Sequence, residues 1–269
     1  MQLSISEIAW QPEEDGAAHD LLRRYGLQAL ELAPTRRFPR LDAVSAEQAR
    51  QWRLELEAAG LAPRAMQALL FGQPDLVLFQ GAEPRAAMLQ YLKRVVDLAA
   101  LLGVGPMVFG SPKNRLRGAM DDAAAMDIAV PFFRELGDYA AARGCIIGME
   151  ANPRDYGCDF LTSARAVAAF TAAVDSPGCR VHFDTGCVIL NGEEALPLLE
   201  ELAPQLCHYH VSQPFLEDFS SCVYPHRGAA AVLRAAGYAG LVSIEMKRGP
   251  RGLEAVEEAL VFTREAYGE

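Results

Sequence analysis

Residues 145–150 have the sequence CIIGME, an apolar run that ends in a carboxylate. Three later runs also end in an ionisable residue: 181–184 (VHFD), 206–210 (LCHYH) and 241–245 (LVSIE). The four terminal residues are 34, 26 and 35 positions apart, which is about the length of one strand and one helix. Charged groups are rarely buried without a partner, so a strand that serves only the core seldom ends in one. Four such strands in succession predict a shared site at their carboxyl ends.

The same alternation of short β-like runs and longer helix-like runs extends along the whole chain. The predicted strands are 2–9, 27–32, 64–69, 105–110, 145–150, 179–184, 206–210 and 241–246. The predicted helices are 14–25, 45–59, 84–102, 120–143, 162–174, 193–202, 227–236 and 252–266. Eight strands alternating with eight helices are typical of an α/β fold, a (β/α)8 TIM barrel with a parallel eight-stranded core. A doubly wound open sheet shows the same alternation, but no glycine-rich nucleotide motif follows the first strand.

Local signals mark the ends of several predicted helices. Glycines at positions 26, 60, 103, 144 and 237 lie where helices should stop, and glycine is the usual C-terminal cap. Thr162 or Ser163 precedes an apolar-periodic run and suits the N-terminal cap of a helix. Pro131 lies inside the longest helical stretch, which predicts a kink or a break there.

Length and composition limit the class of protein. The chain has 269 residues and no low-complexity linker, so we expect one barrel domain over residues 1–269. A net charge of −10 disfavours nucleic acid as a partner. The sequence shows neither a signal peptide nor an apolar stretch of about 18 residues, so we expect a cytoplasmic protein without membrane contact. Six cysteines without a CxxC pair argue against a disulfide framework.

The residues that end the four runs, Glu150, Asp184, His210 and Glu245, are the predicted metal ligands. Three carboxylates and one imidazole form an oxygen-rich donor set, so we expect a divalent cation, Mn²⁺ first, with Mg²⁺, Co²⁺ or Zn²⁺ as alternatives. Such a cation lowers the cost of building enediolate charge beside it. Glu150 and Glu245 are the predicted catalytic residues, each a ligand and a proton carrier. The competing interpretation is that these groups are ion-pair partners in a polar barrel mouth.

The longest irregular segments follow strands and precede helices, on the face where barrel enzymes place their chemistry. They are residues 33–44, 70–83, 111–119, 151–160 and 211–226. Lys113 and Arg115 in one of these loops are candidates to bind an anionic group of a substrate, or else to pair with surplus acids. Lys247, two residues after Glu245, is a weaker candidate of the same kind.

The remaining histidines divide into two groups. His182 and His208 precede Asp184 and His210 by two residues, so they should face the same side one layer deeper in the barrel. There they would contact substrate, orient a ligand or simply pack in the core. His226 and His19 are expected on the surface.

These residues resemble a known group of proteins. The four candidate ligands, residues 110–112 (GSP) and residues 183–186 (FDTG) are similar to the sugar phosphate isomerase/epimerase family of the xylose isomerase-like TIM barrel superfamily, which includes the ketose 3-epimerases. The resemblance covers nearly the whole chain. It implies that the four matching positions bind Mn²⁺ or a similar ion and that Glu150 and Glu245 transfer the proton.

The chain departs from the ketose 3-epimerases at three positions that contact substrate there. Cys187 replaces a histidine, Leu216 replaces an arginine and Tyr156 replaces a glutamate. Cys187 nevertheless remains a candidate substrate contact, because it lies three residues after the Asp184 ligand. The resemblance therefore implies metal binding but no particular ketose.

The sequence thus predicts a divalent-metal-dependent isomerase or epimerase of a sugar, sugar phosphate or related hydroxycarbonyl compound. An inosose-type dehydratase begins with the same proton abstraction and stays open, as does a metal-binding barrel without turnover. An abasic-site endonuclease needs more histidine ligands than five histidines supply. We expect a small-molecule partner, and the loop at 211–226 leaves a homo-oligomer open.

Overall fold

Eight parallel strands form a closed barrel, in the order β1 to β8, in this computed structural model, which describes residues 1–268. The strands are β1 Gln2–Ser6, β2 Ala29–Leu32, β3 Ala62–Met66, β4 Pro106–Phe109, β5 Ile146–Glu150, β6 Cys179–Asp184, β7 Leu206–Ser212 and β8 Leu241–Glu245. β1 pairs with both β2 and β8, which closes the ring and leaves no free sheet edge. The predicted closed TIM barrel is confirmed.

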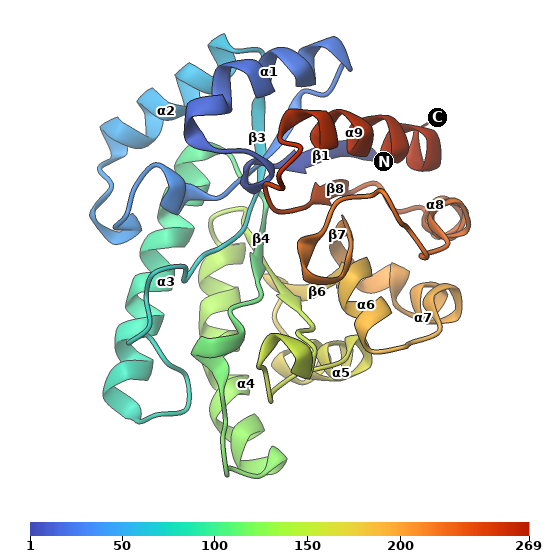
Figure 1. Ribbon diagram of the computed structural model, residues 1–269. Helices are drawn as coiled ribbons and strands as arrows, with labels where there is room; N and C mark the ends of the chain where they lie inside the picture. The colour runs from blue at the N-terminus through green and yellow to red at the C-terminus, as the bar shows by residue number, and fades with distance from the viewer. Residues whose placement is uncertain (269) are drawn as a thin grey trace.

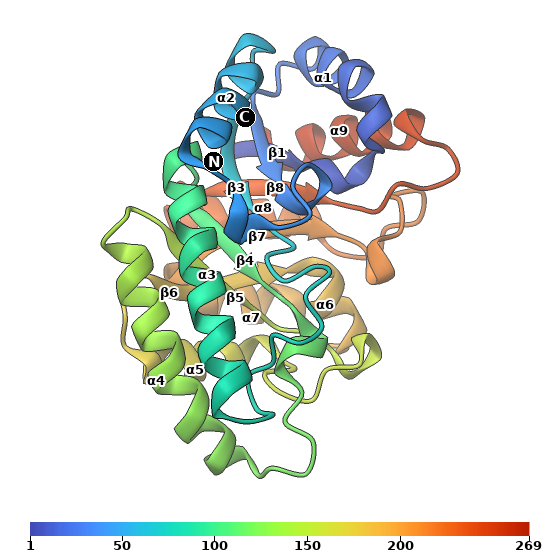
Figure 2. The same ribbon diagram turned by 90° about the vertical axis from the view of Figure 1, so that its left-hand side faces the viewer.

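Helices surround the strands in chain order (Figure 1). They are α1 Asp15–Arg24, α2 Ala46–Ala58, α3 Ala82–Leu102, α4 Asp122–Ala141, α5 Ala164–Val174, α6 Thr185–Leu190, α7 Ala195–Leu202, α8 His226–Ala235 and α9 Leu253–Tyr267. Figure 2 shows α3 and α4 side by side along one flank, where they pack against each other. Within residues 1–268, no helix has the length and apolar content that a membrane span requires.

The predicted helix ends agree with the structure. The five glycines named as caps all have positive φ values, between 67° and 77°, a region that glycine enters without steric cost. Ser163 caps α5, because its side chain accepts a hydrogen bond of 3.2 Å from the backbone N–H of Ala166.

The break considered at Pro131 does not occur, and one helix was not predicted. The helix α4 runs without a break through Pro131, because its buried face, which includes Phe132, Phe133 and Leu136, holds it against the barrel. The helix α6 was not predicted at all. It exists because Asp184 at the end of β6 accepts a hydrogen bond from the backbone N–H of Cys187 and starts a new helical turn.

Most of the apolar core lies between the strands and the helices, whereas the barrel interior is largely polar. The interior strand positions carry Ser4, Ser6, Glu31, Gln67, His182, His208, His210 and Ser243, all of them buried. The small apolar cluster of Ala29, Ala65 and Leu241 shares these interior-facing registers. A barrel interior is ordinarily filled with branched apolar side chains. So many buried polar groups therefore indicate a site that extends down from the barrel mouth.

Strand register brings the four predicted ligands to one end of the barrel. Asp184 on β6 lies opposite His210 on β7, and Ser212 on β7 lies opposite Glu245 on β8. Glu150 ends β5 opposite His182. In contrast, β3 and β4 share only the pair Met66 and Met107, so the loops that follow these two strands are the least constrained by the sheet.

The close approach of β6 to α4 gives a test of the packing. A methyl group at Gly178, just before β6, would lie 2.0 Å from the backbone oxygen of Gly137 in α4. We expect Gly178→Ala to lower the free energy of unfolding by about 2–3 kcal/mol, because backbone atoms cannot yield as a flexible side chain does. The measurement is urea unfolding followed by circular dichroism.

Gly105→Ala is the matched control. Gly105 also precedes a strand, β4, and a methyl group there would meet nothing within 4 Å. We expect this variant to unfold within about 0.5 kcal/mol of the unsubstituted protein. Equal stabilities of the two variants would contradict the proposed contact.

Candidate metal centre

The four side chains predicted as metal ligands come together at the carboxyl ends of β5 to β8. Nδ1 of His210 lies 3.2 Å from a carboxylate oxygen of Glu245. The same nitrogen lies 3.8 Å from Asp184 and 4.0 Å from Glu150. It is buried and has no hydrogen-bond partner. A buried imidazole nitrogen that faces three carboxylates fits a divalent cation, and ligand atoms of Glu150, Asp184 and His210 lie within 4.8 Å of one another.

Hydrogen bonds fix the Asp184 carboxylate. One oxygen accepts a hydrogen bond of 2.6 Å from the backbone N–H of Cys187, and the other accepts one of 2.5 Å from the Ser212 hydroxyl. Ser212 is held in turn because its hydroxyl accepts a bond from the backbone N–H of Gly186. The start of α6 and the end of β7 therefore hold this carboxylate in one orientation before any ion binds.

The Glu150 carboxylate is held from the neighbouring β4 and β5 loops. Its Oε2 accepts a hydrogen bond of 2.7 Å from the Asn152 amide. Arg115 is completely buried beneath it and donates a bond of 2.7 Å to the backbone carbonyl of Glu150. Gly110 leaves room for the carboxylate, because a methyl group there would lie 2.4 Å from the same Oε2 atom. A methyl group at this position would therefore displace the Glu150 carboxylate.

Glu31 on β2 completes the centre, although the sequence pattern did not single it out. Its carboxylate is fully buried, and both oxygens lie 3.0 Å from Nε2 of His210. It also contacts Nε2 of His208 at 3.2 Å and accepts a bond of 2.5 Å from Ser243. A proton on Nε2 of His210, donated to Glu31, leaves the Nδ1 lone pair free for a cation. A carboxylate one residue before the end of a predicted strand was the signal available for finding it.

The buried charges shift the acid–base properties of the centre. Burial raises the pKa of Glu150, and the nearby positive charge of His210 opposes this rise only in part. Burial likewise raises the pKa of Glu245 to about 7. Burial alone would lower the pKa of His210, but the charges of Glu31 and Glu245 outweigh it and raise that pKa well above its usual value. Without a cation, the excess negative charge is therefore balanced by protons.

The two deeper histidines lie next to the centre, as their spacing predicted. Nε2 of His182 is 3.4 Å from Oε1 of Glu150, and the His182 and His210 ring centroids are 4.2 Å apart. Burial lowers the pKa of His182 well below its usual value, so its ring is neutral. Its ligand atom lies within 4.8 Å of those of Glu150, Asp184 and His210, which makes it a fifth potential ligand. His208 contacts Glu31 and, with His182 and His210, forms a second group of potential ligands.

The other residues predicted to contact a substrate lie at different distances from the centre. Cys187 is buried beside Asp184, and burial raises the pKa of its thiol well above the usual value, so it stays protonated. Arg115 reaches Glu150, as described above. Lys113 is exposed at the rim. Lys247 is also exposed and forms an ion pair with Glu217.

Tyr156 and Leu216, two of the positions that differ from the ketose 3-epimerases, lie in loops that contact each other. The Tyr156 hydroxyl accepts a hydrogen bond of 2.9 Å from the backbone N–H of Phe215, and the two rings pack edge to face 5.6 Å apart. Phe215 and Leu216 both have φ values of 58°, which is uncommon for such residues. The loops after β5 and β7 are therefore joined by an aromatic contact next to the site.

The expectation that His226 lies on the surface was wrong. His226 begins α8 and is 3% exposed, with Nδ1 2.8 Å from the Tyr267 hydroxyl. Phe262 packs against its ring edge to face. The residue serves the contact between α8 and α9, outside the barrel, and takes no part in the candidate centre.

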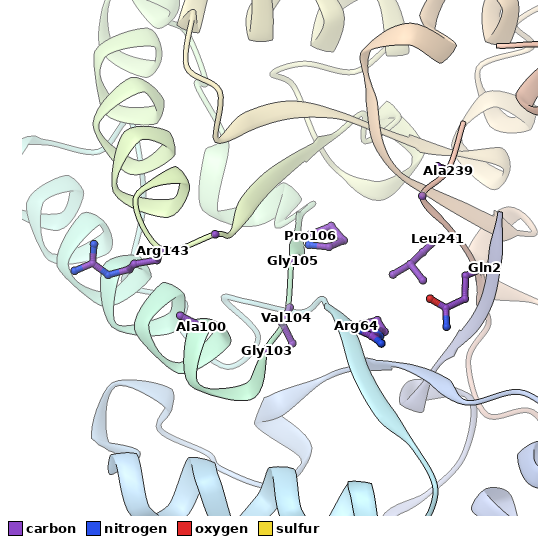
Figure 3. Close-up of a pocket in the computed structure, with 12 residues that line it drawn as sticks. Gln2, Arg64, Ala100, Gly103, Val104, Gly105, Pro106, Arg143, Ala239 and Leu241 are labelled. Atoms are coloured by element: carbon purple, nitrogen blue, oxygen red, sulfur yellow. The ribbon is translucent and has the colours of Figure 1, made fainter. Parts of the chain in front are cut away.

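The opposite end of the barrel has a cavity of about 390 Å³ but no comparable group of side chains. Gln2, Pro106 and Leu241, which begin β1, β4 and β8, line it together with Arg64 (Figure 3). The Arg143 side chain points away from the opening and pairs with Asp97. Among the described residues, the groups that could share a metal ion lie at the carboxyl end instead.

An eight-stranded parallel barrel with a carboxylate and histidine centre at its carboxyl end defines the structural class. The chain belongs to the xylose isomerase-like TIM barrel family, whose model matches residues 19–266. Comparison with curated proteins finds no significant match.

Several solved structures share the fold. A D-psicose 3-epimerase crystallised with D-fructose is 18% identical, with a TM-score of 0.81 and 100% coverage of both chains. A 3-keto-D-glucoside 4-epimerase from E. coli is 16% identical, with a TM-score of 0.79 and coverage of 98% of this chain and 99% of that one. The IOLI protein with a binding zinc atom is 17% identical, with a TM-score of 0.71 and coverage of 99% and 96%.

The contact between Glu31 and His210 predicts an effect on metal affinity. We expect Glu31→Gln to weaken Mn²⁺ binding by about 10- to 100-fold, because the neutral amide no longer fixes the imidazole or raises its basicity. Isothermal titration calorimetry measures the change. Glu7→Gln is the control, since Glu7 is also a buried carboxylate but follows β1 and contacts Ala33 and Arg36. A similar loss in both variants would contradict a specific role for Glu31.

The raised pKa values predict that metal binding depends on pH. Glu245, with a pKa of about 7, holds a proton below that pH, and this proton must leave when a cation binds. We expect the affinity for Mn²⁺ to rise by about tenfold per pH unit between pH 6 and 7 for each proton displaced. Calorimetry in two buffers of different ionisation enthalpy counts the released protons. Affinity that does not change over this range would contradict the assignment of Glu245 as a ligand.

Proposed function

We propose that the protein is a divalent-metal-dependent isomerase or epimerase that acts on a sugar or a related hydroxycarbonyl compound. The observation that carries the proposal is the placement of Glu150 and Glu245. Both side chains are nearly buried, and each lies within 4.0 Å of Nδ1 of His210. They come from β5 and β8, with β6 and β7 between them. Two carboxylates can therefore approach one substrate from two directions.

The two glutamates supply the acid and the base. One carboxylate removes the proton from the carbon next to the carbonyl group, and the other returns a proton. Return to the opposite face of the same carbon gives an epimer, and return to the neighbouring carbon gives an isomer. General acid–base catalysis of this kind contributes about 10²- to 10⁴-fold to the rate.

The donor set favours a cation that accepts mainly oxygen ligands. We propose Mn²⁺ as the natural ion, with Mg²⁺, Co²⁺ and Zn²⁺ as alternatives that fit three carboxylates and one imidazole. When bound, the ion would hold the substrate oxygens and offset negative charge as the proton leaves. Asp184 and His210 bind the ion but do not transfer the proton, because hydrogen bonds hold both side chains in place.

The other predicted contacts have separate proposed roles. His182, neutral and 3.4 Å from Glu150, can hydrogen-bond a substrate hydroxyl. Arg115 acts through Glu150 and holds it in position. Cys187 presents a protonated thiol where the ketose 3-epimerases have a histidine. The similar structures include epimerases of a free ketose and of a keto-glucoside, and both compounds are candidate substrates for this chain.

The role of Glu245 can be separated from that of His210. We expect Glu245→Gln to retain weak Mn²⁺ binding but to lose at least about 100-fold in exchange of the substrate proton with solvent deuterium. We expect His210→Ala mainly to lower metal occupancy, since a ligating imidazole does not serve as the base. Exchange is followed by NMR in D₂O with D-psicose, D-tagatose and methyl 3-keto-β-D-glucoside, and occupancy by metal analysis.

Glu217→Gln serves as the control, because Glu217 is an exposed carboxylate on the same face and pairs only with Lys247. This variant should exchange at the unsubstituted rate. Full exchange by Glu245→Gln would contradict the assignment of the base. Loss of water from a cyclitol without exchange into any sugar would instead favour the dehydratase.

A further inference from the structure

A pocket of about 620 Å³ lies between the loops that follow β3 and β4, at the same end of the barrel as the candidate metal centre. Among its ten lining residues, Lys113 is the only charged one. The apolar part of the lining consists of Ala68, Leu70, Phe71, Pro74 and Pro112. Phe71 is 73% exposed, which is unusual for a side chain of this size. The pocket therefore offers an apolar surface that nothing within residues 1–268 covers.

The pocket adjoins the loop that contacts Glu150. Ser111, one of its lining residues, follows Gly110 directly. A methyl group on Gly110 would lie 2.4 Å from Oε2 of Glu150. The strands β3 and β4 share only one residue pair, so the sheet constrains the loops that form the pocket less than it constrains the others. A compound bound at Glu150 would thus have the pocket next to it.

The walls of the pocket are held in place by hydrogen bonds. Asn114 is buried, and its amide donates bonds of 2.8 Å to the carbonyl oxygens of Gln73 and Leu76. Its own carbonyl accepts a bond of 2.9 Å from the backbone N–H of Leu78. Asn114 therefore joins the two loops, and the pocket is a formed feature of the fold.

The backbone of the pocket is strained at two positions. Ala68 and Ser111 have φ values of 56° and 45°, although neither is glycine. Each such residue costs about 1–3 kcal/mol, and strain of this kind collects at ligand sites. Both residues line the pocket, so the strain coincides with the surface that a ligand would contact.

Apolar exposure is concentrated on this end of the molecule. The large apolar side chains that are exposed among the described residues are Leu54, Phe71, Leu116, Phe215 and Val223. All except Leu54, which is on α2, lie in loops that follow β3, β4 or β7. A free ketose carries a hydroxyl on nearly every carbon and buries less apolar area on such a surface than an apolar ring does. A sugar joined to an apolar ring can place its hydroxyls at the centre and the ring in the pocket.

We propose that the substrate is a glycoside-type hydroxycarbonyl compound whose apolar, ring-sized aglycone occupies the pocket between the β3 and β4 loops. This inference rests on the proposed function, because it places the sugar part at Glu150 and Glu245. Phe71 and Pro112 bind the ring, and Ser111 lies between the ring and the sugar. Burial of about half of a phenyl ring corresponds to roughly a tenfold gain in affinity.

The first experiment measures binding without turnover. Phenyl β-D-glucopyranoside and methyl β-D-glucopyranoside have no carbonyl group and cannot react by proton abstraction. We expect the Mn²⁺-loaded protein to bind the phenyl compound about tenfold more tightly in an NMR titration. Phe71→Ala should abolish the preference, and Leu54→Ala, which removes an exposed leucine on α2 outside the pocket lining, should retain it. Equal binding of the two glucosides would overturn the inference.

The second experiment measures deuterium exchange into phenyl and methyl 3-keto-β-D-glucosides. We expect kcat/KM to be about tenfold higher for the phenyl compound and equal for the two in Phe71→Ala. Equal rates in the unsubstituted protein would overturn the inference and leave the proposed function intact. A phenyl preference in binding with no exchange into any compound would reject the proposed function and support the pocket. If Phe71→Ala instead converts a dimer to a monomer without affecting ligand binding, the apolar surface is an interface between copies and the inference is wrong.

Discussion

The structure of the candidate centre depends on the position of one imidazole ring between two groups of buried acids. Nε2 of His210 faces Glu31, and Nδ1 faces the three carboxylates at the ends of β5, β6 and β8. Burying several carboxylates together is very costly unless positive charge accompanies them. Arg115 provides one such charge, but it lies beneath Glu150 and contacts only its backbone carbonyl. A proton or a divalent cation must supply the remainder, and this is why the same geometry shifts the pKa values and fits a metal.

The barrel makes this arrangement possible because the apolar core and the polar candidate site occupy different parts of the fold. The apolar side chains that stabilise the fold lie mainly between the strands and the helices. The interior can therefore carry serines, histidines and a glutamate without loss of the main core. Parallel strands with fixed register then deliver side chains from distant parts of the sequence to one end. The cavity at the other end is bounded by strand starts and has no such cluster among the described residues.

Much of this arrangement could be predicted from the sequence, for specific reasons. The eight strands and the positions of Glu150, Asp184, His210 and Glu245 follow from a pattern that repeats at the period of one β/α unit. Their common location follows because parallel strands have their carboxyl ends on the same side. Roles as ligands remain predictions, since geometry brings the atoms together without identifying an ion.

The parts that sequence reasoning missed depend on contacts between residues far apart in the chain. Glu31 lies 179 positions before His210, and no local pattern pairs a strand carboxylate with an imidazole at that distance. His226 was misplaced because the contact that buries it, with Tyr267, comes from the next helix. Pro131 failed to break α4 because tertiary packing of the surrounding phenylalanines outweighs the local penalty.

The candidate ion site resembles that of the ketose 3-epimerases, but the residues around it differ, and this difference affects which substrate would fit. The donor atoms at the centre match the ketose 3-epimerase pattern, whereas Cys187, Tyr156 and Leu216 replace groups that could hydrogen-bond a polyol or carry charge. Tyr156 now packs on Phe215, so the loops after β5 and β7 interact through aromatic rings. The loops after β3 and β4 likewise present Phe71 and Pro112. The candidate ion-binding groups lie on β5 to β8, whereas Phe71 and Pro112 lie in the loops after β3 and β4, so the fold allows the rim to vary without a change in the centre.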